Sequence, residues 1–279
     1  MKVGIIGYGF VGKALKNGLK PSAKISLIDP KLNTSVNDLL SFGPEIIFIC
    51  VPTPMGDDGS QDVSILCETI DNLKGMNITC PIVLKSTTLP NTLEEISSKV
   101  PNLVYNPEFL REKHADQDFI NPNMIVIGSN KDTSSSFLEE FYINYTYCIC
   151  KNYIKTDLIT ASFIKFTINS FLATKVSFFN ELNDIFSKVN TTETWDNFIQ
   201  YLSYDERIGN SHMSVPGHDG KLGFGGACLP KDSKAFVKFA ELNESRFNVL
   251  NSAIIVNNNI RQQYNNDQRE SDQNINFLD

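Results

Sequence analysis

The sequence has no paired cysteine motif, no long apolar run and no excess of basic residues. Its 279 residues include 25 Lys and Arg against 32 Asp and Glu, and the formal net charge of −7 argues against a general nucleic-acid binder. The apolar runs are short and interrupted, so none predicts a membrane span. A strand-like run begins at Lys2, which leaves no room for a secretory leader. We therefore expect a cytoplasmic protein without nucleic-acid or membrane partners.

The number and spacing of the cysteines also favour a cytoplasmic protein. Six cysteines are present, and none of them forms a CxxC pair. Cys148 and Cys150 alternate in what reads as a strand, while Cys50 and Cys80 adjoin apolar strand-like runs. We interpret them as reduced core residues, and we predict neither a disulfide framework nor a zinc site. Internal repeats are also absent, and the length suits one large domain or two smaller ones.

The stretch GFGGACLPKD, residues 223–232, places a single cysteine between a glycine turn and the start of a helix. Proline suits the first helical turn, where its missing N–H is not needed. A thiol at a helix N-terminus beside Lys231 should be more acidic than a free thiol. Cys228 is therefore a candidate nucleophile, with the Asp232 carboxylate close by. The alternative is a buried cysteine beside an ordinary helix cap.

The beginning of the chain carries a dinucleotide-binding pattern. A strand at residues 2–6 leads into GYGFVG, residues 7–12, and a helix follows to about Leu19. In this pattern Gly7 makes the tight turn, Gly9 admits a pyrophosphate, and Gly12 lets the helix pack on the strand. A second strand, residues 24–28, ends at Asp29, whose carboxylate would accept a hydrogen bond from a ribose hydroxyl and repel a 2′-phosphate. The pattern predicts NAD in preference to NADP.

Further strand-like runs alternate with helical segments up to about residue 150. They lie at residues 45–51, 81–85, 103–106, 124–127 and 145–150. Alternation of this kind predicts an α/β fold with a Rossmann-type, doubly wound parallel sheet and ligands at the carboxyl ends of its strands. Four candidate site residues fall just after strand ends, although each could be a cap or turn residue: Thr53, Thr87, Glu108 and Glu112.

The pattern changes to helices in the second part of the chain. Residues 158–189 contain no proline or glycine, and their apolar positions recur at helical spacing. A helix of that length, roughly 48 Å, usually bridges domains or packs on a second subunit. Lys165 and Asn169 share one of its faces. Shorter helices are predicted at residues 193–202, 231–242 and 246–264, followed by a polar tail that we expect to be frayed.

These motifs resemble the UDP-glucose/GDP-mannose dehydrogenase family, over nearly the whole chain and in the family's order. The matching blocks are GYGFVG, VPTP, KSTTLP, NPEFLRE, the Lys-x3-Asn of the long helix, FNEL and GFGGACLPKD. Residues 207–212 and 215–217 look most like the UDP-glucose branch. The resemblance implies an NAD-dependent oxidoreductase that oxidises a nucleotide-sugar primary alcohol to a carboxylate by two hydride transfers, without releasing the aldehyde.

The resemblance also implies roles for the matched side chains. Cys228 would form a thiohemiacetal and then a thioester, because a thiol can add, hold and later leave. Lys165 and its partner Asn169 would stabilise the oxyanion. Asp232 would position or activate water together with Lys165.

Three further catalytic assignments come from the same resemblance. Glu108 would be the base for thioester hydrolysis with Glu112 beside it, and Thr87 would hold the active-site water. We expect no metal. The implied cofactor-binding residues are Gly7, Tyr8, Gly9, Phe10, Val11, Gly12, Asp29, Val51, Pro52, Thr53, Thr87 and Lys231. The implied substrate-binding residues are Phe109, Leu110, Arg207, Phe224, Gly225 and Gly226.

Organisation and assembly follow from the resemblance as expectations. We expect an NAD-binding Rossmann domain at residues 1–154, an all-α central dimerisation domain at 155–265 and a disordered tail at 266–279. The helix at 158–189 would form the core of a homodimer, with Arg207 reaching the partner's sugar site. The family's second α/β domain, which holds much of the nucleotide, has no counterpart in the sequence.

Two alternatives to a UDP-glucose 6-dehydrogenase activity stay open at this point. A single-step dehydrogenase of the 3-hydroxyacid type would share the NAD domain and a helix lysine, but it would not need the motif around Cys228. A remnant that binds NAD without turnover would explain the missing domain, but it would not explain the complete catalytic set. The number of NADH molecules formed per sugar separates the three.

Overall fold

The computed structural model describes residues 1–76 and 78–278, and the chain divides into two compact units. Unit 1 comprises Met1–Thr53 and Asp62–Lys165, and unit 2 comprises Pro54–Gln61 and the chain from Phe166 onward. The division falls within the long helix, α7 (Leu158–Lys188), so its first turns belong to unit 1 and the rest to unit 2.

Unit 1 is built on a seven-stranded sheet in the order β2-β1-β3-β4-β5-β6-β7. Its strands are β1 (Lys2–Ile6), β2 (Lys24–Ile28), β3 (Ile46–Ile49), β4 (Ile82–Leu84), β5 (Leu103–Tyr105), β6 (Ile125–Gly128) and β7 (Tyr153–Thr156). All neighbouring strands run parallel except β5 and β6, which pair antiparallel at Tyr105 and Gly128. Strand β2 lies on one side of β1, and β3 lies on the other side. The strand order therefore reverses between β1 and β3, and sheets of this type bind ligands at such a switch point.

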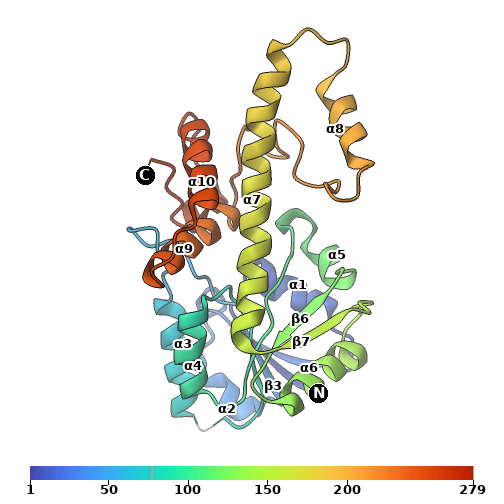
Figure 1. The fold of residues 1–279 in the computed structure, drawn as a ribbon. Coiled ribbons are helices and arrows are strands. Elements are labelled where there is room, and N and C mark those ends of the chain that lie inside the picture. The colour runs from blue at the N-terminus through green and yellow to red at the C-terminus, as the bar shows by residue number, and fades with distance from the viewer. Residues whose placement is uncertain (77, 279) are drawn as a thin grey trace. The chain divides into compact units, whose positions relative to one another are not determined.

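Helices cover both faces of this sheet (Figure 1). They are α1 (Phe10–Gly18), α2 (Asp38–Phe42), α3 (Ser64–Gly75), α4 (Pro90–Lys99), α5 (Ala115–Ile120) and α6 (Asp132–Tyr145), with short 3-10 turns η1 (Pro30–Leu32) and η2 (Glu112–His114).

Strand β3 shows why the sheet is covered twice. Ile47 and Ile49 pack in the cluster that includes side chains of α2, α3 and α4. Ile46 and Phe48 point to the opposite face and pack with α1, α5 and α6. All four side chains are fully buried. A run that is apolar at every position is what a strand needs when both of its faces are covered.

Unit 2 is helical apart from its loops. After α7 it contains α8 (Trp195–Ser203), α9 (Leu229–Leu242), α10 (Asn248–Arg261) and α11 (Gln268–Asp272). Phe186 near the end of α7 stacks on Phe198, which folds α8 back along that end (Figure 1). Phe166 packs on Phe236, with ring centroids 5.4 Å apart, and this contact joins α7 to α9.

The segment of residues 54–61 belongs to unit 2 although it lies early in the chain. Met55 packs in a small cluster with Ile275 and Phe277, and its N–H donates to the Gln273 carbonyl at 3.0 Å. Residues 54–61 therefore pack against residues 273–277.

Three details differ from the sequence predictions. Residues 145–150 were predicted as a strand, but Tyr145 ends α6 and the strand is β7, because short apolar runs fit either state. The sheet is not purely parallel. Within the tail predicted to be disordered, Gln268–Asp272 form α11, which begins with a capping box between Asp267 and Glu270, and the Glu270 side chain is completely buried. Residue 279 of that tail lies outside the described residues.

All six cysteines are free thiols, and each is partly exposed. Residues 1–76 and 78–278 contain no group of three or more His, Cys, Asp or Glu side chains arranged to hold a metal. Every helix in the same residues is too short or too polar to cross a lipid bilayer.

Candidate active site

The dinucleotide loop, residues 7–12, lies at the switch point of the sheet and leaves room for a ligand. Gly7 has a φ of +90°, and a Cβ there would stand 2.6 Å from the Cys50 carbonyl oxygen after β3. A Cβ on Gly12 would stand 2.1 Å from the Gly7 carbonyl oxygen, so helix α1 packs directly on the turn. A Cβ on Gly9 would meet nothing within 4 Å. Two glycines are thus required by packing, while the third faces open space, as a pyrophosphate site needs.

Asp29 follows β2 and is half-buried. One carboxylate oxygen accepts from the Tyr8 N–H at 2.7 Å, and the other accepts from the Lys31 N–H at 2.9 Å. The side chain therefore ties the dinucleotide loop to β2 and also caps η1. Its position beside that loop fits the contact with a ribose hydroxyl that the sequence predicts.

The ends of β3 and β4 are joined by side-chain hydroxyls. Ser86 donates to the Val51 carbonyl at 2.7 Å, and Thr53 donates to the Thr87 carbonyl at 3.0 Å. Thr53 and Thr87 are both buried, whereas Pro52 is exposed. These contacts hold two predicted site segments side by side at the carboxyl edge of the sheet.

Lys165 and Glu108 meet inside unit 1. The Lys165 ammonium donates to the Glu108 carbonyl at 2.5 Å and lies 3.6 Å from the Glu108 carboxylate. It also stands 5.1 Å from the centre of the Phe109 ring. The other Glu108 carboxylate oxygen accepts from the Leu110 N–H at 2.6 Å. Both charged side chains are buried, so a fixed cation and a fixed carboxylate lie together in a low-dielectric setting, where each acts strongly on a developing charge.

A lysine outside the predicted set lies behind this pair. Lys85 is buried and donates to the Asn106 side-chain oxygen at 2.9 Å and to the Tyr142 hydroxyl at 3.3 Å. Burial lowers the pKa of Lys85, and the nearby Cys50 and Glu108 oppose that change only in part. Burial also raises the pKa of the Cys50 thiol to about 12, so this cysteine stays protonated at neutral pH.

A second polar cluster lies in unit 2, around Asp232. One Asp232 carboxylate oxygen accepts from the Asn169 amide at 2.6 Å, and the other accepts from the Lys231 ammonium at 2.6 Å. Asp232 is only 1% exposed. Cys228 is the N-cap residue of α9, and its carbonyl accepts from the Asp232 N–H at 2.9 Å. The candidate nucleophile thus begins the helix that carries the buried carboxylate.

The backbone before Cys228 is held by amide side chains. We call residues 223–228 the cysteine loop. The Gly223 N–H donates to Asn180 of α7 at 2.9 Å, and the Phe224 N–H donates to Asn257 of α10 at 2.6 Å. Asn257 donates in return to the Phe224 carbonyl at 3.0 Å. Gly223 has a φ of +75°, and a Cβ there would stand 2.5 Å from the Asn257 oxygen.

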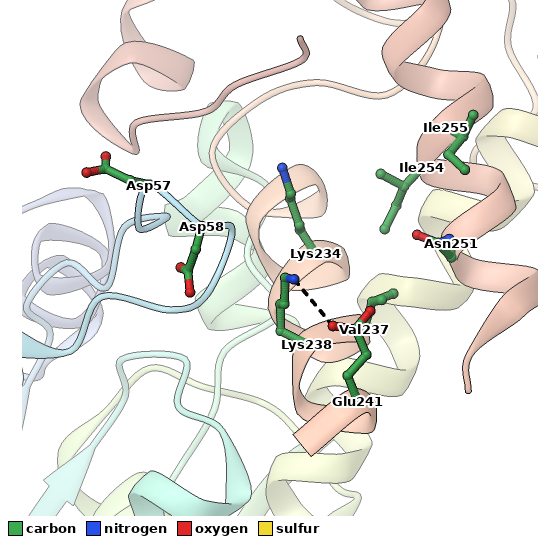
Figure 2. A pocket seen from close by; sticks show the side chains of 9 residues that line it. All are labelled: Asp57, Asp58, Lys234, Val237, Lys238, Glu241, Asn251, Ile254 and Ile255. Carbon is green, nitrogen blue, oxygen red and sulfur yellow. Dashed lines mark hydrogen bonds and ion pairs between the residues drawn. The ribbon is translucent and has the colours of Figure 1, made fainter. Parts of the chain in front are cut away.

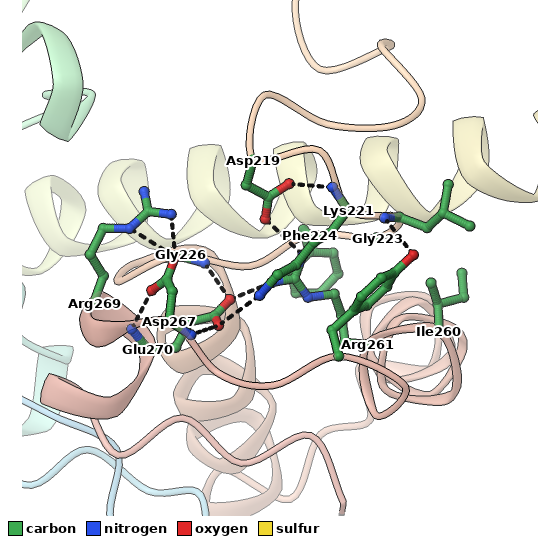
Figure 3. Close-up of polar contacts among 12 residues, drawn as sticks. Asp219, Lys221, Gly223, Phe224, Gly226, Ile260, Arg261, Asp267, Arg269 and Glu270 are labelled. Carbon is green, nitrogen blue, oxygen red and sulfur yellow. Dashed lines mark hydrogen bonds and ion pairs between the residues drawn. The ribbon is translucent and has the colours of Figure 1, made fainter.

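A buried ion pair also supports the cysteine loop (Figure 3). Glu270 accepts from the Gly226 N–H at 3.1 Å and from Arg261 at 2.5 Å. Arg261 also donates to Asp219 at 2.8 Å. We call Asp219, Arg261 and Glu270 the clamp. Burial raises the pKa of Asp219, but the hydrogen bonds from Arg261 and from the Lys221 N–H, with the Arg261 charge, outweigh burial and leave that pKa below its usual value of 3.8.

Two predicted residues lie away from these clusters in their own units. The Arg207 side chain is 90% exposed and forms a bidentate pair with Asp205. Glu112 is exposed in η2. Unit 1 therefore brings Lys165 together with Glu108, and unit 2 brings Asn169, Lys231 and Asp232 together beside Cys228.

A pocket of about 400 Å³ is lined by side chains of the 54–61 segment, α9 and α10 (Figure 2). Asp57 and Asp58 line it from the 54–61 segment, and Lys234 and Lys238 line it from α9. Lys238 pairs with Glu241 at 3.3 Å. No predicted site residue lines this pocket, and its mixed charges favour neither a cationic nor an anionic ligand.

The sequence reasoning missed the side chains that support the cysteine loop. Asn180, Asn257 and Arg261 lie within helical patterns, where polar residues usually face solvent. For Glu270 one signal was present, because Asp267 followed three residues later by an acid is the spacing of a capping box. It predicts a helix start in the tail, but not the burial of its carboxylate.

Two family models match the chain. Residues 28–146 match the NAD binding domain of the UDP-glucose/GDP-mannose dehydrogenase family, and residues 159–259 match the central domain of the same family. NAD is therefore the cofactor that goes with the first of these domains, and the open space at Gly9 and the placement of Asp29 fit it.

Curated relatives agree with these matches. The chain is 36% identical over 217 residues to a UDP-glucose 6-dehydrogenase of Rickettsia bellii, covering 75% of this chain and 48% of that protein. It is 33% identical over 258 residues to a UDP-glucose 6-dehydrogenase of Bacillus subtilis, covering 87% and 55%. The chain thus spans about half the length of the curated relatives it matches.

Solved structures extend the likeness to the fold. A UDP-glucose dehydrogenase from Pyrobaculum islandicum superposes with a TM-score of 0.74 at 25% identity, covering 92% of this chain and 67% of that one. A Mycobacterium tuberculosis 3-hydroxyisobutyrate dehydrogenase has a TM-score of 0.70 at 12% identity, covering 91% and 92%, and shows a shared fold alone. Since both of its matched domains are this family's and its fold agrees, the chain belongs to the UDP-glucose/GDP-mannose dehydrogenase family.

Proposed function

We propose that the chain catalyses the NAD-dependent, four-electron oxidation of a nucleotide-sugar primary alcohol to a uronate, with UDP-glucose as substrate and UDP-glucuronate as product. The observation that carries this proposal is the Asp232 cluster. A buried carboxylate, satisfied by Asn169 and Lys231, lies in the helix that Cys228 begins. A one-step alcohol oxidation needs no thiol, whereas an aldehyde that is held and oxidised again does.

Cys228 supplies the covalent step in this proposal. When bound, NAD⁺ accepts the hydride in each of the two oxidations. The Cys228 thiolate adds to the carbonyl carbon of the bound aldehyde and forms a thiohemiacetal. After the second oxidation the sugar is held as a thioester, and water releases the carboxylate and returns the thiol. The sum is one alcohol, one water and two NAD⁺ converted to one carboxylate, two NADH and three protons.

The charged side chains act on the oxygen atoms of that sequence. Lys165, buried against Glu108, stabilises the oxyanion that forms when the thiolate adds, and Asn169 is its partner donor. Asp232 positions the water, and Glu108 takes its proton during thioester hydrolysis. Glu112 acts beside Glu108, and Thr87 holds the active-site water.

The remaining assignments concern binding. The dinucleotide loop, Asp29, Val51, Pro52, Thr53 and Lys231 are assigned to NAD binding. Six residues bind the sugar nucleotide: Phe109, Leu110, Arg207, Phe224, Gly225 and Gly226. We assign residues 1–154 to NAD binding and 155–265 to the central domain, and we place the protein in the cytoplasm.

We further propose a homodimer through α7. Phe171, Phe178 and Ile185 recur every seven residues, so they lie along one face of the helix. Their side chains have exposed fractions of 64%, 60% and 58%, and such exposure is unusual for a line of large apolar side chains on one helix face. Arg207, exposed at the surface of its own chain, reaches the partner's sugar site in this assembly.

The test of the function is a stoichiometry. The purified protein is incubated with NAD⁺ and a panel of UDP- and GDP-sugars, and NADH and uronate are both counted. The proposal expects two NADH per UDP-glucuronate formed, with no free aldehyde. One NADH per sugar would indicate the single-step alternative, and none with any sugar would indicate a protein that binds NAD without turnover.

A further inference from the structure

We propose that the clamp, Asp219, Arg261 and Glu270, positions the cysteine loop, so that the end of the chain sets the placement and ionisation of Cys228. These are positioning residues, because they act on the thiol through the backbone at Gly225 and Gly226. The proposal rests on the proposed role of Cys228 as nucleophile.

Direct contact with the loop backbone is the first observation behind it. Glu270 accepts the Gly226 N–H, two residues before Cys228. A Cβ on Gly225 would stand 2.2 Å from the Arg261 guanidinium and 2.3 Å from the Glu270 carboxylate. The ion pair therefore touches the loop where only a hydrogen atom fits. Any movement of the pair must move residues 225 and 226.

Burial makes the clamp rigid. The Arg261 and Glu270 side chains are 1% and 0% exposed, and Asp219 is 12% exposed. Buried charges are stable only when paired and hydrogen-bonded, so these side chains have one favourable arrangement. Glu270 is also fixed by its own helix start, because its second carboxylate oxygen accepts from the Asp267 N–H at 2.9 Å.

The path from the clamp to the thiol is short. Gly226 is followed by Ala227 and then by Cys228, which begins α9. A thiol in this position is stabilised as thiolate by the partial positive charge of the helix terminus, which falls off within one turn. A cysteine loop that is released from Glu270 therefore changes the ionisation of Cys228.

The test measures the thiol directly. Wild-type and Glu270→Ala proteins are alkylated with iodoacetamide from pH 5 to 10, and the peptide containing Cys228 is quantified by mass spectrometry. We expect the alkylation midpoint of Cys228 to move to higher pH in Glu270→Ala, while Cys67 and Cys150 keep their profiles. Glu270→Gln, which keeps an acceptor for the Gly226 N–H, should restore most of the wild-type profile. With UDP-glucose and NAD⁺, kcat of Glu270→Ala should fall about 100-fold, the loss expected when a reacting group is displaced by about 1 Å.

Two further variants separate positioning from stability. Leu250→Ala removes a buried apolar side chain near the start of α10, and it should lower Tm without moving the Cys228 profile. If Glu270→Ala does not fold, the double variant Arg261→Met and Glu270→Leu replaces it. This variant removes both charges and the acceptor for the Gly226 N–H, and proteins often tolerate the replacement of a buried ion pair by apolar residues.

An unchanged Cys228 profile in folded Glu270→Ala, or in the folded Arg261→Met and Glu270→Leu double variant, would overturn the proposal. A shift of the same size in Leu250→Ala would overturn it too. Because alkylation needs no substrate, either result is independent of whether the protein turns over UDP-glucose.

Discussion

The two glycine loops of this chain use the same residue for opposite purposes. In the dinucleotide loop, Gly9 faces open space, and a side chain there would meet no protein atom within 4 Å. In the cysteine loop, Gly225 lies against Arg261 and Glu270, and a side chain there would collide with both. Gly9 leaves space for a ligand, whereas Gly225 lets the Arg261 and Glu270 side chains pack against the loop backbone.

This difference shows how the two loops do their work. A loop that binds a phosphate must offer N–H groups and stay open until the ligand arrives. A loop that carries a nucleophile must be fixed beforehand, because catalysis depends on the placement of the reacting group. The structure supplies that fixation from α10 and α11. A glycine-rich motif alone does not say which kind of loop it forms, and the side chains packed around it do.

Cys228→Ser should have the largest effect, because it changes the cysteine loop and leaves the dinucleotide loop intact. We expect kcat to fall by about 10⁴-fold, as for removal of a nucleophile elsewhere, because a serine hydroxyl ionises far less and leaves poorly from an ester. NAD binding, measured by fluorescence titration, should be unchanged because the dinucleotide loop is intact. Two NADH per sugar at a near wild-type rate in this variant would remove Cys228 from the mechanism.

A matched pair of alanine substitutions tests the two glycine loops separately. Gly9→Ala should weaken NAD binding about tenfold or more while changing the free energy of unfolding by only about 0.5 kcal/mol, because its methyl group enters ligand space. Gly225→Ala should lower the free energy of unfolding by about 1–3 kcal/mol and leave NAD affinity unchanged. Urea unfolding and NAD titration of both variants are the measurements. The opposite pattern would mean that the two loops have been assigned to the wrong roles.

Asp29→Asn tests the dinucleotide loop more gently. The variant keeps an oxygen that can accept a hydrogen bond, but it loses the charge that repels a 2′-phosphate. We expect the ratio of kcat/KM for NAD⁺ over NADP⁺ to fall at least about tenfold, mainly through better use of NADP⁺. A wild-type protein that used both cofactors equally would show that Asp29 does not discriminate between them.

The smallest effect concerns pH and the clamp. The pKa of Asp219 is lowered in the folded protein, so its carboxylate stabilises the fold above the usual value of 3.8 and loses that contribution as pH falls through the lowered pKa. The expected size is under about 1 kcal/mol, because the group keeps contact with solvent. Urea unfolding between pH 5 and 3 should show a shallower pH dependence for Asp219→Asn than for wild type. Equal slopes would mean that the Arg261 contact does not favour the ionised form.

Much of unit 1 was predictable because its signals are local. Ile46 to Ile49 form an unbroken apolar run, and the glycine spacing from Gly7 to Gly12 follows from turn and packing needs. The antiparallel step between β5 and β6 was not predictable, since it depends on how distant strands pair. The strand predicted at residues 145–150 was wrong because alternating apolar residues also fit the end of a helix such as α6.

From the residues alone, the grouping of site side chains was predictable where one motif carries several of them. Cys228, Lys231 and Asp232 stand close together in the sequence, so their association is local. Arg261 and Glu270 are nine residues apart in a stretch rich in polar residues, and that composition usually indicates a solvated tail. Their burial arises from mutual neutralisation and from contact with Gly225 and Gly226, which no local pattern records.

Whether Cys228 holds the sugar between the two oxidations can be measured by rapid acid quench followed by mass spectrometry. Enzyme mixed with UDP-glucose and NAD⁺ is quenched during the first turnover, and the peptide that contains Cys228 is analysed. We expect an added mass equal to the sugar nucleotide as a thioester on Cys228, and its loss on treatment with hydroxylamine. Formation of two NADH with no adduct on Cys228 at any quench time, or with the adduct on another residue, would contradict it.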